Sequence, residues 1–340
     1  MRVIQAMAGA ATGGAEGFFM RLVLALHAAG IEQGAIIRRH PHRASLLQEA
    51  GIPTRELRFG GPLDLVSRFG YAKAIREADP DIVMTWMNRA SGLCPSGRFI
   101  QIGRLGGFYD LKYYARCHHL VGNTQGIVNY IVGEGWPMDR AHHISNFVDT
   151  VYAVPVTRDA LATPEGVPVL LALGRLHPNK AFDVLIEAMV DLPDAWLWLA
   201  GDGPLADPLR RHAQDRGVVD RVRFLGWRDD VGALLGAADV LVCPSRHEPL
   251  GNVILEGWAR QVPVVAAASQ GPSEVIVDGE TGLLAPVDDA RALARRIGEV
   301  LDDRAEAQAM VSRAHDAYEC RFSRQAIVGQ YVALFEEVTR

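Results

Sequence analysis

The residues best suited to chemistry lie in the stretch 245–256, which reads Ser-Arg-His-Glu-Pro-Leu-Gly-Asn-Val-Ile-Leu-Glu. An apolar run at 238–244 precedes it and predicts a buried strand, and the run 253–259 has the amphipathic pattern of a helix. The stretch therefore predicts a strand, a tight Pro/Gly loop and the first turns of a helix. Glu248 is placed in the loop, and Glu256 about two turns into the helix.

The expected helix start, near Gly251 and Asn252, indicates the kind of ligand that this loop would bind. A helix N-terminus presents unpaired N–H groups and a partial positive charge, which suit a phosphate. A carboxylate beside it, here Glu248, would instead accept hydrogen bonds from hydroxyl groups. The combination suits a ligand that is anionic at one end and polyhydroxylated at the other, such as a sugar nucleotide.

A second unit of the same kind follows directly, because Gln261-Val-Pro-Val-Val leads to Ser269-Gln-Gly-Pro-Ser-Glu274. This is another apolar strand that ends in a glycine loop with an acid. Two successive strand–loop–helix units place both loops at one edge of a parallel sheet. That edge, at the carboxyl ends of the strands, is where open α/β sheets bind ligands.

Two further glycine loops also follow predicted strands. The strand at 3–7 leads into a loop with Gly13 and Gly14 before a predicted helix at 18–29, an arrangement that can hold a phosphate. The strand at 195–200 leads into Gly-Asp-Gly-Pro-Leu-Ala at 201–206, which satisfies the G-x-G-x-x-A spacing of dinucleotide sites. An NAD-dependent oxidoreductase is therefore an alternative, although the rigid proline and the lack of an acid after the next strand disfavour it.

Predicted strands and helices alternate along the whole chain, which favours an α/β fold with parallel sheets. The segment 150–166 is rich in Pro, Thr and Ala without a clear period and predicts a linker. The chain length of 340 residues accommodates two domains, which we place at 1–150 and 151–320. Two predicted helices, at 305–318 and 323–338, end the chain.

The pattern Ser-x-x-Glu-x-x-Gly, with a second Glu eight residues after the first and a following Val-Pro-Val-Val, resembles family four of the glycosyltransferases. The similarity extends over most of the chain. It implies the GT-B fold, in which two Rossmann-like domains face a cleft: 1–150 would bind the acceptor and 151–320 the nucleotide sugar. The final helix, at 321–340, would pack back on the first domain.

The resemblance also implies a reaction and its participants. The reaction would be a retaining, metal-independent transfer of a sugar from a nucleoside-diphosphate sugar to a hydroxyl of a glycan or lipid-linked acceptor, as in cell-surface polysaccharide or lipopolysaccharide synthesis. It requires no cofactor. Because no metal takes part, fixed cations and N–H dipoles must stabilise the leaving diphosphate.

The family's site residues map onto matching positions of this sequence. The basic pair that holds the diphosphate corresponds to Arg175 and Lys180, and Glu248 would hold the hydroxyls of the donor sugar. These three are the expected catalytic residues. Glu256 would hold the ribose, and Trp227 and Arg228 lie in the loop that contacts the base. The remaining expected donor contacts are Gly13, Gly14, Gly174, Pro249, Leu250, Gly251 and Asn252.

One departure from the family affects the first domain. Many relatives place a histidine after the strand predicted at 98–103, where this chain has Arg104-Leu-Gly-Gly. His118 and His119 come before the next strand and are not substitutes. Without that histidine, a non-catalytic sugar-nucleotide-binding module remains an alternative to an enzyme. The candidates for the acceptor or the cleft are Asn88, Arg89, Arg104, Tyr109 and Asp110.

Composition limits the partners and the compartment. No apolar run reaches the roughly 18 residues of a membrane span. The four cysteines lack metal or redox spacing, so we expect reduced thiols and a cytoplasmic protein. Residues 1–150 carry 16 basic and 12 acidic side chains, a net +4, which leaves −9 for the rest of the chain, given the total of −5. This asymmetry favours an anionic acceptor or peripheral contact with the inner membrane face, and nothing indicates a nucleic-acid partner.

Overall fold

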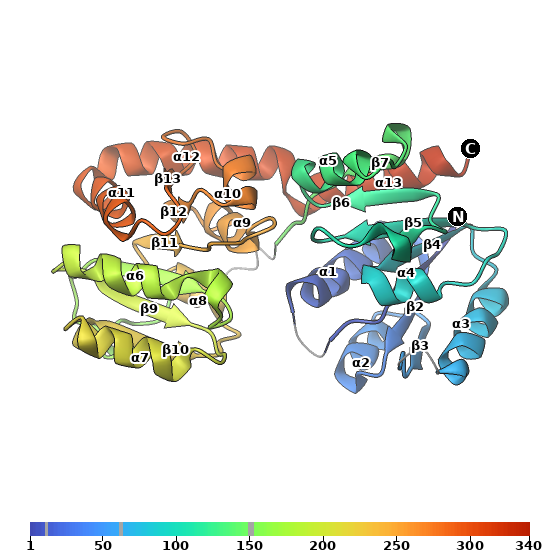
Figure 1. Cartoon of the computed structure of the whole chain (residues 1–340), viewed down its shortest axis with the longest axis horizontal. Coiled ribbons are helices and arrows are strands. Elements are labelled where there is room, and N and C mark those ends of the chain that lie inside the picture. Colours follow the sequence, from blue (N-terminus) through green and yellow to red (C-terminus); the bar gives the residue numbers. More distant parts are fainter. Residues whose placement is uncertain (11–12, 61–63, 149–152) are drawn as a thin grey trace. The chain divides into compact units, whose positions relative to one another are not determined.

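The computed structural model describes residues 1–10, 13–60, 64–148 and 153–340. Two compact units divide the chain (Figure 1). Unit 1 comprises Met1–Phe147 and Ser323–Arg340, and unit 2 comprises Val148–Phe322. The sequence placed the boundaries at 150 and 320, close to these positions. The first unit is therefore discontinuous in sequence, because the last helix belongs to it.

Unit 1 is built on a seven-stranded parallel sheet with the order β3-β2-β1-β4-β5-β6-β7. Its strands are β1 Arg2–Met7, β2 Glu32–Arg38, β3 Thr54–Leu57, β4 Ile82–Trp86, β5 Ile100–Leu105, β6 His119–Gly122 and β7 Ala141–His143. The order reverses between β1 and β4, where the chain returns to the middle of the sheet. The carboxyl ends beside such a reversal form the crevice in which open α/β sheets bind ligands.

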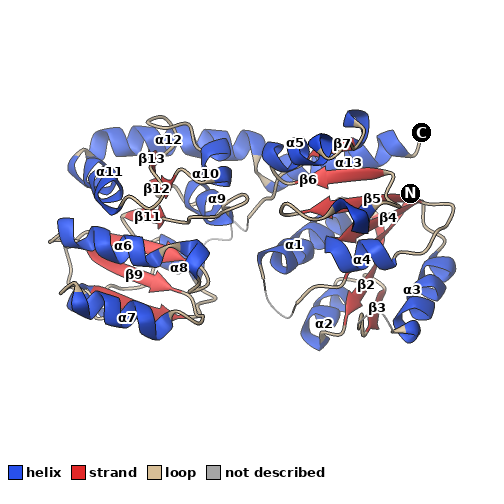
Figure 2. Cartoon of the chain, viewed as in Figure 1, coloured by secondary structure: helices blue, strands red, loops and turns tan. Residues whose placement is uncertain are grey.

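Helices cover both faces of this sheet (Figure 2). The helices are α1 Gly14–Ala28, α2 Pro41–Glu49, α3 Leu65–Ala78, α4 Met87–Leu93, α5 Gln125–Gly133 and α13 Arg324–Val338. One buried cluster joins β1, β2, β4 and β5 to α1, α2 and α13, and separate clusters lie under α3 and α4 and under α5. The central strands β1, β2, β4 and β5 are buried along most of their length, as expected for a parallel sheet that is covered on both faces.

Unit 2 has a six-stranded parallel sheet with the order β10-β9-β8-β11-β12-β13. Its strands are β8 Val169–Leu173, β9 Trp196–Ala200, β10 Val222–Gly226, β11 Val240–Cys243, β12 Val264–Ala267 and β13 Leu283–Ala285. The order reverses between β8 and β11. The loops that leave these two strands are therefore neighbours, although about 70 residues separate them in the sequence.

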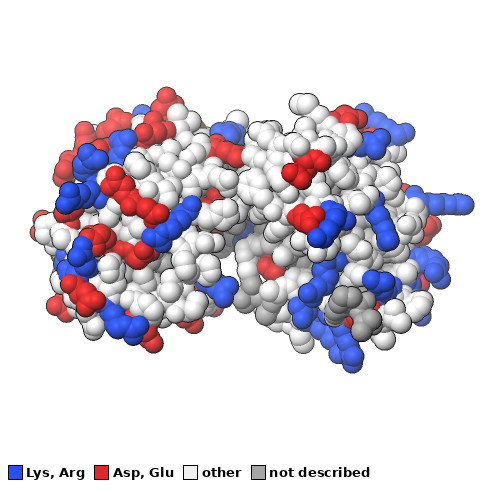
Figure 3. Space-filling model, viewed as in Figure 1, with Lys and Arg blue, Asp and Glu red and all other residues white. Residues whose placement is uncertain are grey.

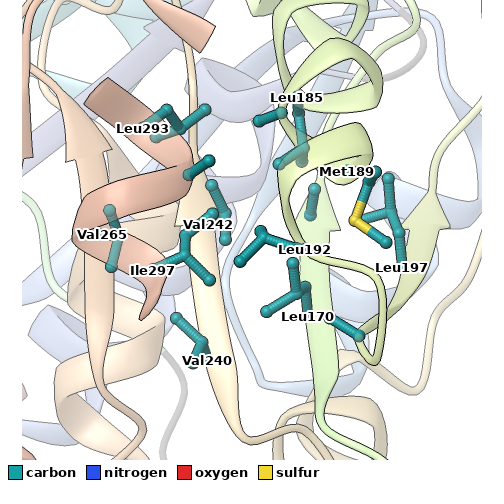
Figure 4. Close-up of a cluster of buried hydrophobic side chains, with 14 of the residues drawn as sticks. Leu170, Leu185, Met189, Leu192, Leu197, Val240, Val242, Val265, Leu293 and Ile297 are labelled. Atoms are coloured by element: carbon teal, nitrogen blue, oxygen red, sulfur yellow. The ribbon is translucent and has the colours of Figure 1, made fainter. Parts of the chain in front are cut away.

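The helices of unit 2 also lie on both faces of its sheet. They are α6 Phe182–Ala188, α7 Ala206–Asp215, α8 Val231–Leu235, α9 Asn252–Ala259, α10 Gln270–Val275, α11 Ala290–Asp302 and α12 Arg304–Arg321. Alternate residues of β8 face opposite sides: Leu170 packs with α6 and α11 (Figure 4), and Leu171 packs in the cluster of α9. The rigid sheet fixes the loops at its carboxyl edge.

These two parallel α/β units confirm the expected fold class. The elements that the sequence analysis did not predict include the short ones α4 and β7. Helix α4 has seven residues and starts directly after β4, and β7 has three residues, so neither is long enough to show a period. In the part of the chain that the structure describes, no helix combines the length and apolar character needed to cross a bilayer.

Candidate active site

The loops that follow β8 and β11 bring two of the expected catalytic residues into direct contact. The Lys180 ammonium donates a hydrogen bond to the Glu248 carboxylate and forms an ion pair with it. Both side chains are largely buried, with 24% of Lys180 and 12% of Glu248 exposed. The pair lies at the carboxyl edge of the sheet, beside the reversal between β8 and β11.

The loop after β8 is shaped to carry Lys180. Gly174 has a φ of +145°, and a Cβ at this position would lie 3.3 Å from Cε of Lys180. The glycine therefore leaves room for the lysine stem to lie across the backbone. The 3-10 turn Pro178–Lys180 follows, with the imidazole of His177 accepting a hydrogen bond from the N–H of Asn179.

Two hydrogen bonds and the backbone conformation of one glycine hold the loop after β11. The hydroxyl of Ser245 donates to the Glu248 carboxylate over 3.3 Å. The N–H of Gly271, from the next strand–loop–helix unit, donates to the Glu248 carbonyl over 2.8 Å. Gly251 adopts a left-handed conformation, with φ +89°, and caps α9. Glu256 is the fifth residue of that helix, one turn in rather than the two turns expected.

Electrostatics keep the lysine charged. Burial acts to lower the pKa of Lys180, but the nearby Glu248 carboxylate, Cys243 and Glu256 outweigh burial, so that the pKa is raised. The pKa of the Cys243 thiol is raised by its own burial and by Glu248. The site therefore contains a cation that remains protonated at neutral pH, next to an acid that accepts hydrogen bonds.

Gly271 is required for the position of Glu248, and replacing it with alanine is expected to damage the site. A Cβ on Gly271 would lie 2.6 Å from the backbone N, Cα and C of Leu250, so the loop would have to move. We expect Gly271→Ala to lower turnover by about 10²-fold and to cost about 1–3 kcal/mol of stability. Steady-state kinetics and chemical denaturation measure the two effects.

The matched control is Gly298→Ala in α11 of the same unit, where a Cβ would meet nothing within 4 Å. That substitution should stabilise the protein by roughly 0.5–1 kcal/mol, because alanine is the better helix former. Equal effects of the two substitutions would contradict the role given to Gly271.

Arg246 ties together the loops that carry the ion pair. Its guanidinium bonds both carboxylate oxygens of Asp183, over 2.9 and 2.6 Å, and it also reaches the carbonyl of Pro178 and the carboxylate of Asp288. These contacts join the loop after β11 to the start of α6 and to the loop after β13. The carbonyl of Asn179 strengthens the link by accepting from the N–H of His247 over 3.2 Å.

Removal of the Arg246 contacts should make the positions of the site loops less fixed without unfolding the protein. We expect Arg246→Ala to lower kcat/KM on the order of tenfold to a hundredfold, because Lys180 and Glu248 would lose their fixed separation. Arg246→Lys should restore only part of the activity, since an ammonium cannot bond a carboxylate in a bidentate way. Donor KM and kcat are measured separately, with Arg211→Ala on the exposed surface of α7 as control. Unchanged kinetics in Arg246→Ala would contradict a positioning role.

Other residues expected to bind the donor lie at the same edge of unit 2. Arg175 is exposed in the loop after β8, near Lys180 in sequence. In the loop after β10, the guanidinium of Arg228 bonds both oxygens of Asp230, over 2.7 and 2.6 Å. Trp227 is 64% exposed beside it. Arg228 is thus occupied by a carboxylate, and Trp227 presents the freer surface. Pro249, Leu250, Gly251 and Asn252 form the entry to α9.

The glycines at 201–206 have a packing role. A Cβ on Gly201 would lie 1.9 Å from the carbonyl oxygen of Gly174, and one on Gly203 would lie 2.5 Å from that of Leu176. The glycines let the loop after β9 pass directly over the loop that carries Lys180. The contact is between two loops. Backbone atoms of the loop after β8 therefore occupy the space in which a pyrophosphate would have to bind.

In unit 1, the loop after β1 contacts the carboxylate of Glu16, a residue of the following helix, α1. The carboxylate of Glu16 accepts from the N–H of Ala10 over 2.7 Å, and a Cβ on Gly13 would lie 2.3 Å from it. Glu16 is 5% exposed. Gly14 begins α1. A phosphate could bind at this loop only if Glu16 moved away. Ala11 and Thr12 lie outside the described residues.

Four of the other candidates in unit 1 lie near the carboxyl ends of β4 and β5. Asn88 accepts a hydrogen bond from the hydroxyl of Tyr114 over 3.0 Å, and Arg89 donates to the carbonyl of Phe59 over 2.8 Å. Asp110 caps a 3-10 turn and forms an ion pair with Lys112, at 2.5 Å. Burial raises the pKa of Tyr109, so its hydroxyl stays protonated.

The structure corrects the expected position of Arg104. It is not in a loop but inside β5, with 2% of its surface exposed. Its guanidinium donates to the hydroxyl of Tyr331 over 3.0 Å and to the side-chain oxygen of Asn146. It stacks 4.6 Å from the ring centres of both Phe18 and Trp86. Arg104 therefore holds α13 in the core and does not face an acceptor.

Sequence reasoning missed the residues that support the ion pair. Arg246 and Gly271 lie within the quoted motifs but received no role there, and Asp183 and Asp288 lie outside them. The contacts of Arg246 join positions 42–68 residues apart. For Glu16, the signal was a carboxylate in the first turn of a helix after glycines, a position that the helix dipole favours. In the described part of the chain, no three His, Cys, Asp or Glu side chains group as metal ligands.

Comparison with known proteins identifies the family of the chain. The family model for glycosyl transferases group 1 matches residues 154–317. The chain is 42% identical over 328 residues to the lipopolysaccharide core biosynthesis glycosyltransferase LpsE of Rhizobium meliloti (strain 1021), covering 95% of each chain. It is 36% identical over 327 residues to LpsD of the same organism, also with 95% of each chain covered.

A solved structure shares the fold. The crystal structure of Anabaena HepE in complex with UDP superimposes with a TM-score of 0.87 at 21% identity, and it covers 99% of this chain and 100% of that one. The relatives are glycosyltransferases by name, which removes the support for an NAD-dependent oxidoreductase. The protein is a member of the group 1 glycosyltransferases.

Proposed function

We propose that the protein transfers a sugar from a nucleoside-diphosphate sugar to a hydroxyl of a lipopolysaccharide-core glycan, with retention at the anomeric carbon and without a metal. The observation that carries the proposal is the partly buried Lys180–Glu248 pair at the carboxyl edge of unit 2, beside the reversal in strand order. The names of LpsE and LpsD support the class of acceptor.

Charge on the leaving group is the main demand of the reaction. When the bond between the sugar carbon and the diphosphate breaks, the departing oxygen becomes negative. Lys180 and Arg175 supply positive charge, and the N-terminus of α9 supplies N–H dipoles. Each charge-assisted hydrogen bond contributes about 1.5–3 kcal/mol. These cations are fixed in the protein, so the mechanism assigns no step to a metal.

The acids would orient the donor. Glu248 accepts hydrogen bonds from the sugar hydroxyls, which places the anomeric carbon near Lys180, and Glu256 accepts from the ribose. The acceptor oxygen attacks from the same face as the leaving group, and its proton passes to the departing phosphate oxygen. This route accounts for retention and requires no base from the protein. We place the reaction in the cytoplasm, where nucleotide sugars would be available.

A donor screen tests the proposal. UDP-, GDP- and ADP-sugars are compared by thermal shift, and the stabilising donors are then tested for hydrolysis and for transfer to a lipopolysaccharide-core acceptor. One donor should stabilise the protein and be consumed. Nuclear magnetic resonance of the product should show the same anomeric configuration as the donor. Inversion would refute the retaining route. Binding of a donor with no turnover in the presence of acceptor would instead favour the non-catalytic module.

A further inference from the structure

The first turns of α3 expose an unusual set of apolar side chains. Leu65 is 58% exposed, and Val66 and Phe69 are each 74% exposed. The opposite side of the helix is anchored in unit 1 by Ser67, Tyr71 and Ile75. Across the described residues, no other window of five positions contains three large apolar side chains exposed to this degree.

Exposed arginines surround this apolar tip. Arg38 pairs in register with Leu57 at the carboxyl ends of β2 and β3, and the N–H of Arg39 donates to the carbonyl of Leu57 over 2.9 Å. Arg58 follows Leu57 directly and is exposed. The pKa of Asp64, the N-cap of α3, is lowered mainly by its hydrogen bonds with Ser67 and Gly60, with a smaller contribution from the positive charge of Arg58. Figure 3 shows basic atoms gathered over and around α2, beside these strand ends.

Arg68 adds a fourth exposed arginine, from α3 itself. Two acids are nearby, but both are engaged: Asp64 accepts from Ser67 and from the N–H of Gly60, and Glu56 accepts from the N–H of His40. We call the set Leu65, Val66, Phe69, Arg38, Arg39, Arg58 and Arg68 the α3 tip. It combines an apolar end with a positive border.

We propose that the α3 tip docks on the surface of an anionic lipid bilayer. Apolar side chains that enter the headgroup region, together with cations that remain at the anionic surface, are the two contributions that hold an interfacial helix. A protein partner fits less well, because a stable interface takes roughly 20–30 residues from each side. The tip offers seven.

The position of the tip connects it with the proposed function. Helix α3 begins after β3, so the tip lies at the carboxyl edge of the unit 1 sheet, the edge that also carries the loops after β1 and β4. Docking there would bring this edge to the membrane that carries a lipid-linked acceptor. Only this link to a lipid-linked acceptor rests on the proposed function. Binding to vesicles requires neither donor nor acceptor.

The test is co-sedimentation of the full chain with vesicles of phosphatidylethanolamine and phosphatidylglycerol, compared with vesicles of phosphatidylcholine alone. The protein should partition to the anionic vesicles, and added salt should weaken binding. Val66→Ser/Phe69→Ser should lower the partition coefficient about tenfold or more. Arg58→Gln/Arg68→Gln should lower it by a similar factor, at roughly fivefold per arginine.

Val154→Ser is the matched control, because Val154 is 75% exposed but lies in unit 2. It should bind as the unaltered protein does. Hydrolysis of the donor in solution should be the same in all variants, so that a loss of vesicle binding is separable from a loss of transfer. Absence of binding to anionic vesicles, or equal binding by the tip variants and the control, would overturn the proposal. So would a dimer in solution that Val66→Ser/Phe69→Ser dissociates.

Discussion

Replacing Lys180 with alanine is expected to lower kcat for sugar transfer by about 10²–10³-fold, the usual loss when one preorganised group that stabilises developing charge is removed. The lysine ammonium is largely buried, is held by Glu248 and has a raised pKa. Its charge is therefore present and fixed before the donor binds. Steady-state kinetics with the preferred donor measures the change.

The fold should survive this substitution, because the side chain of Lys180 lies in a loop and not in a hydrophobic cluster. Lys73→Ala is the natural control, since the chain has only three lysines and that of α3 is 63% exposed. Lys73→Ala should leave kcat unchanged. If Lys180→Ala also transferred sugar at the original rate, Lys180 could not be the residue that stabilises the leaving diphosphate.

Replacing Glu248 is expected to have the second large effect, for a different reason. Glu248→Gln keeps the size of the side chain and one acceptor oxygen but removes the negative charge that balances Lys180. We expect kcat/KM to fall about 10²-fold or more, because the sugar hydroxyls lose a charged acceptor that is worth about 1.5–3 kcal/mol for each bond. The effect should appear with the sugar nucleotide and be small for binding of the free nucleoside diphosphate, which lacks the sugar.

This difference allows the roles of Glu248 and Lys180 to be distinguished by experiment. Isothermal titration with the nucleoside diphosphate should show a larger loss for Lys180→Ala than for Glu248→Gln. The double variant should lose about as much activity as the worse single variant, because residues in one contact act as a unit. Fully additive losses would mean that the ion pair seen here does not persist in the complex with the donor.

The support around this pair explains why short motifs are only part of the site. Arg246 follows Ser245 in the motif, yet its partners Asp183 and Asp288 come from two other loops. Gly271 reaches the carbonyl of Glu248 from the next unit of the chain. These contacts depend on the strand order, which no local pattern of residues encodes.

By itself, the sequence determined the class of the protein and predicted Lys180 and Glu248 as its principal site residues. Continuous apolar runs predict strands buried on both faces, and glycine loops at their ends predict a binding edge, because both signals are local. Lys180 and Glu248 follow from the same patterns and from the resemblance to a family. Their direct contact, across 68 positions, is a property of the parallel sheet that places β8 beside β11.

The tertiary structure decided the roles of residues whose partners are distant. Arg104 looked like a loop residue available to an acceptor, but α13 brings Tyr331 to it from 227 positions away and buries it. The glycines at 201 and 203 looked like a dinucleotide fingerprint, but they allow two loops to cross at backbone contact. A side chain's type and spacing specify what chemistry it can do, whereas burial and long-range contacts determine whether a ligand can reach it.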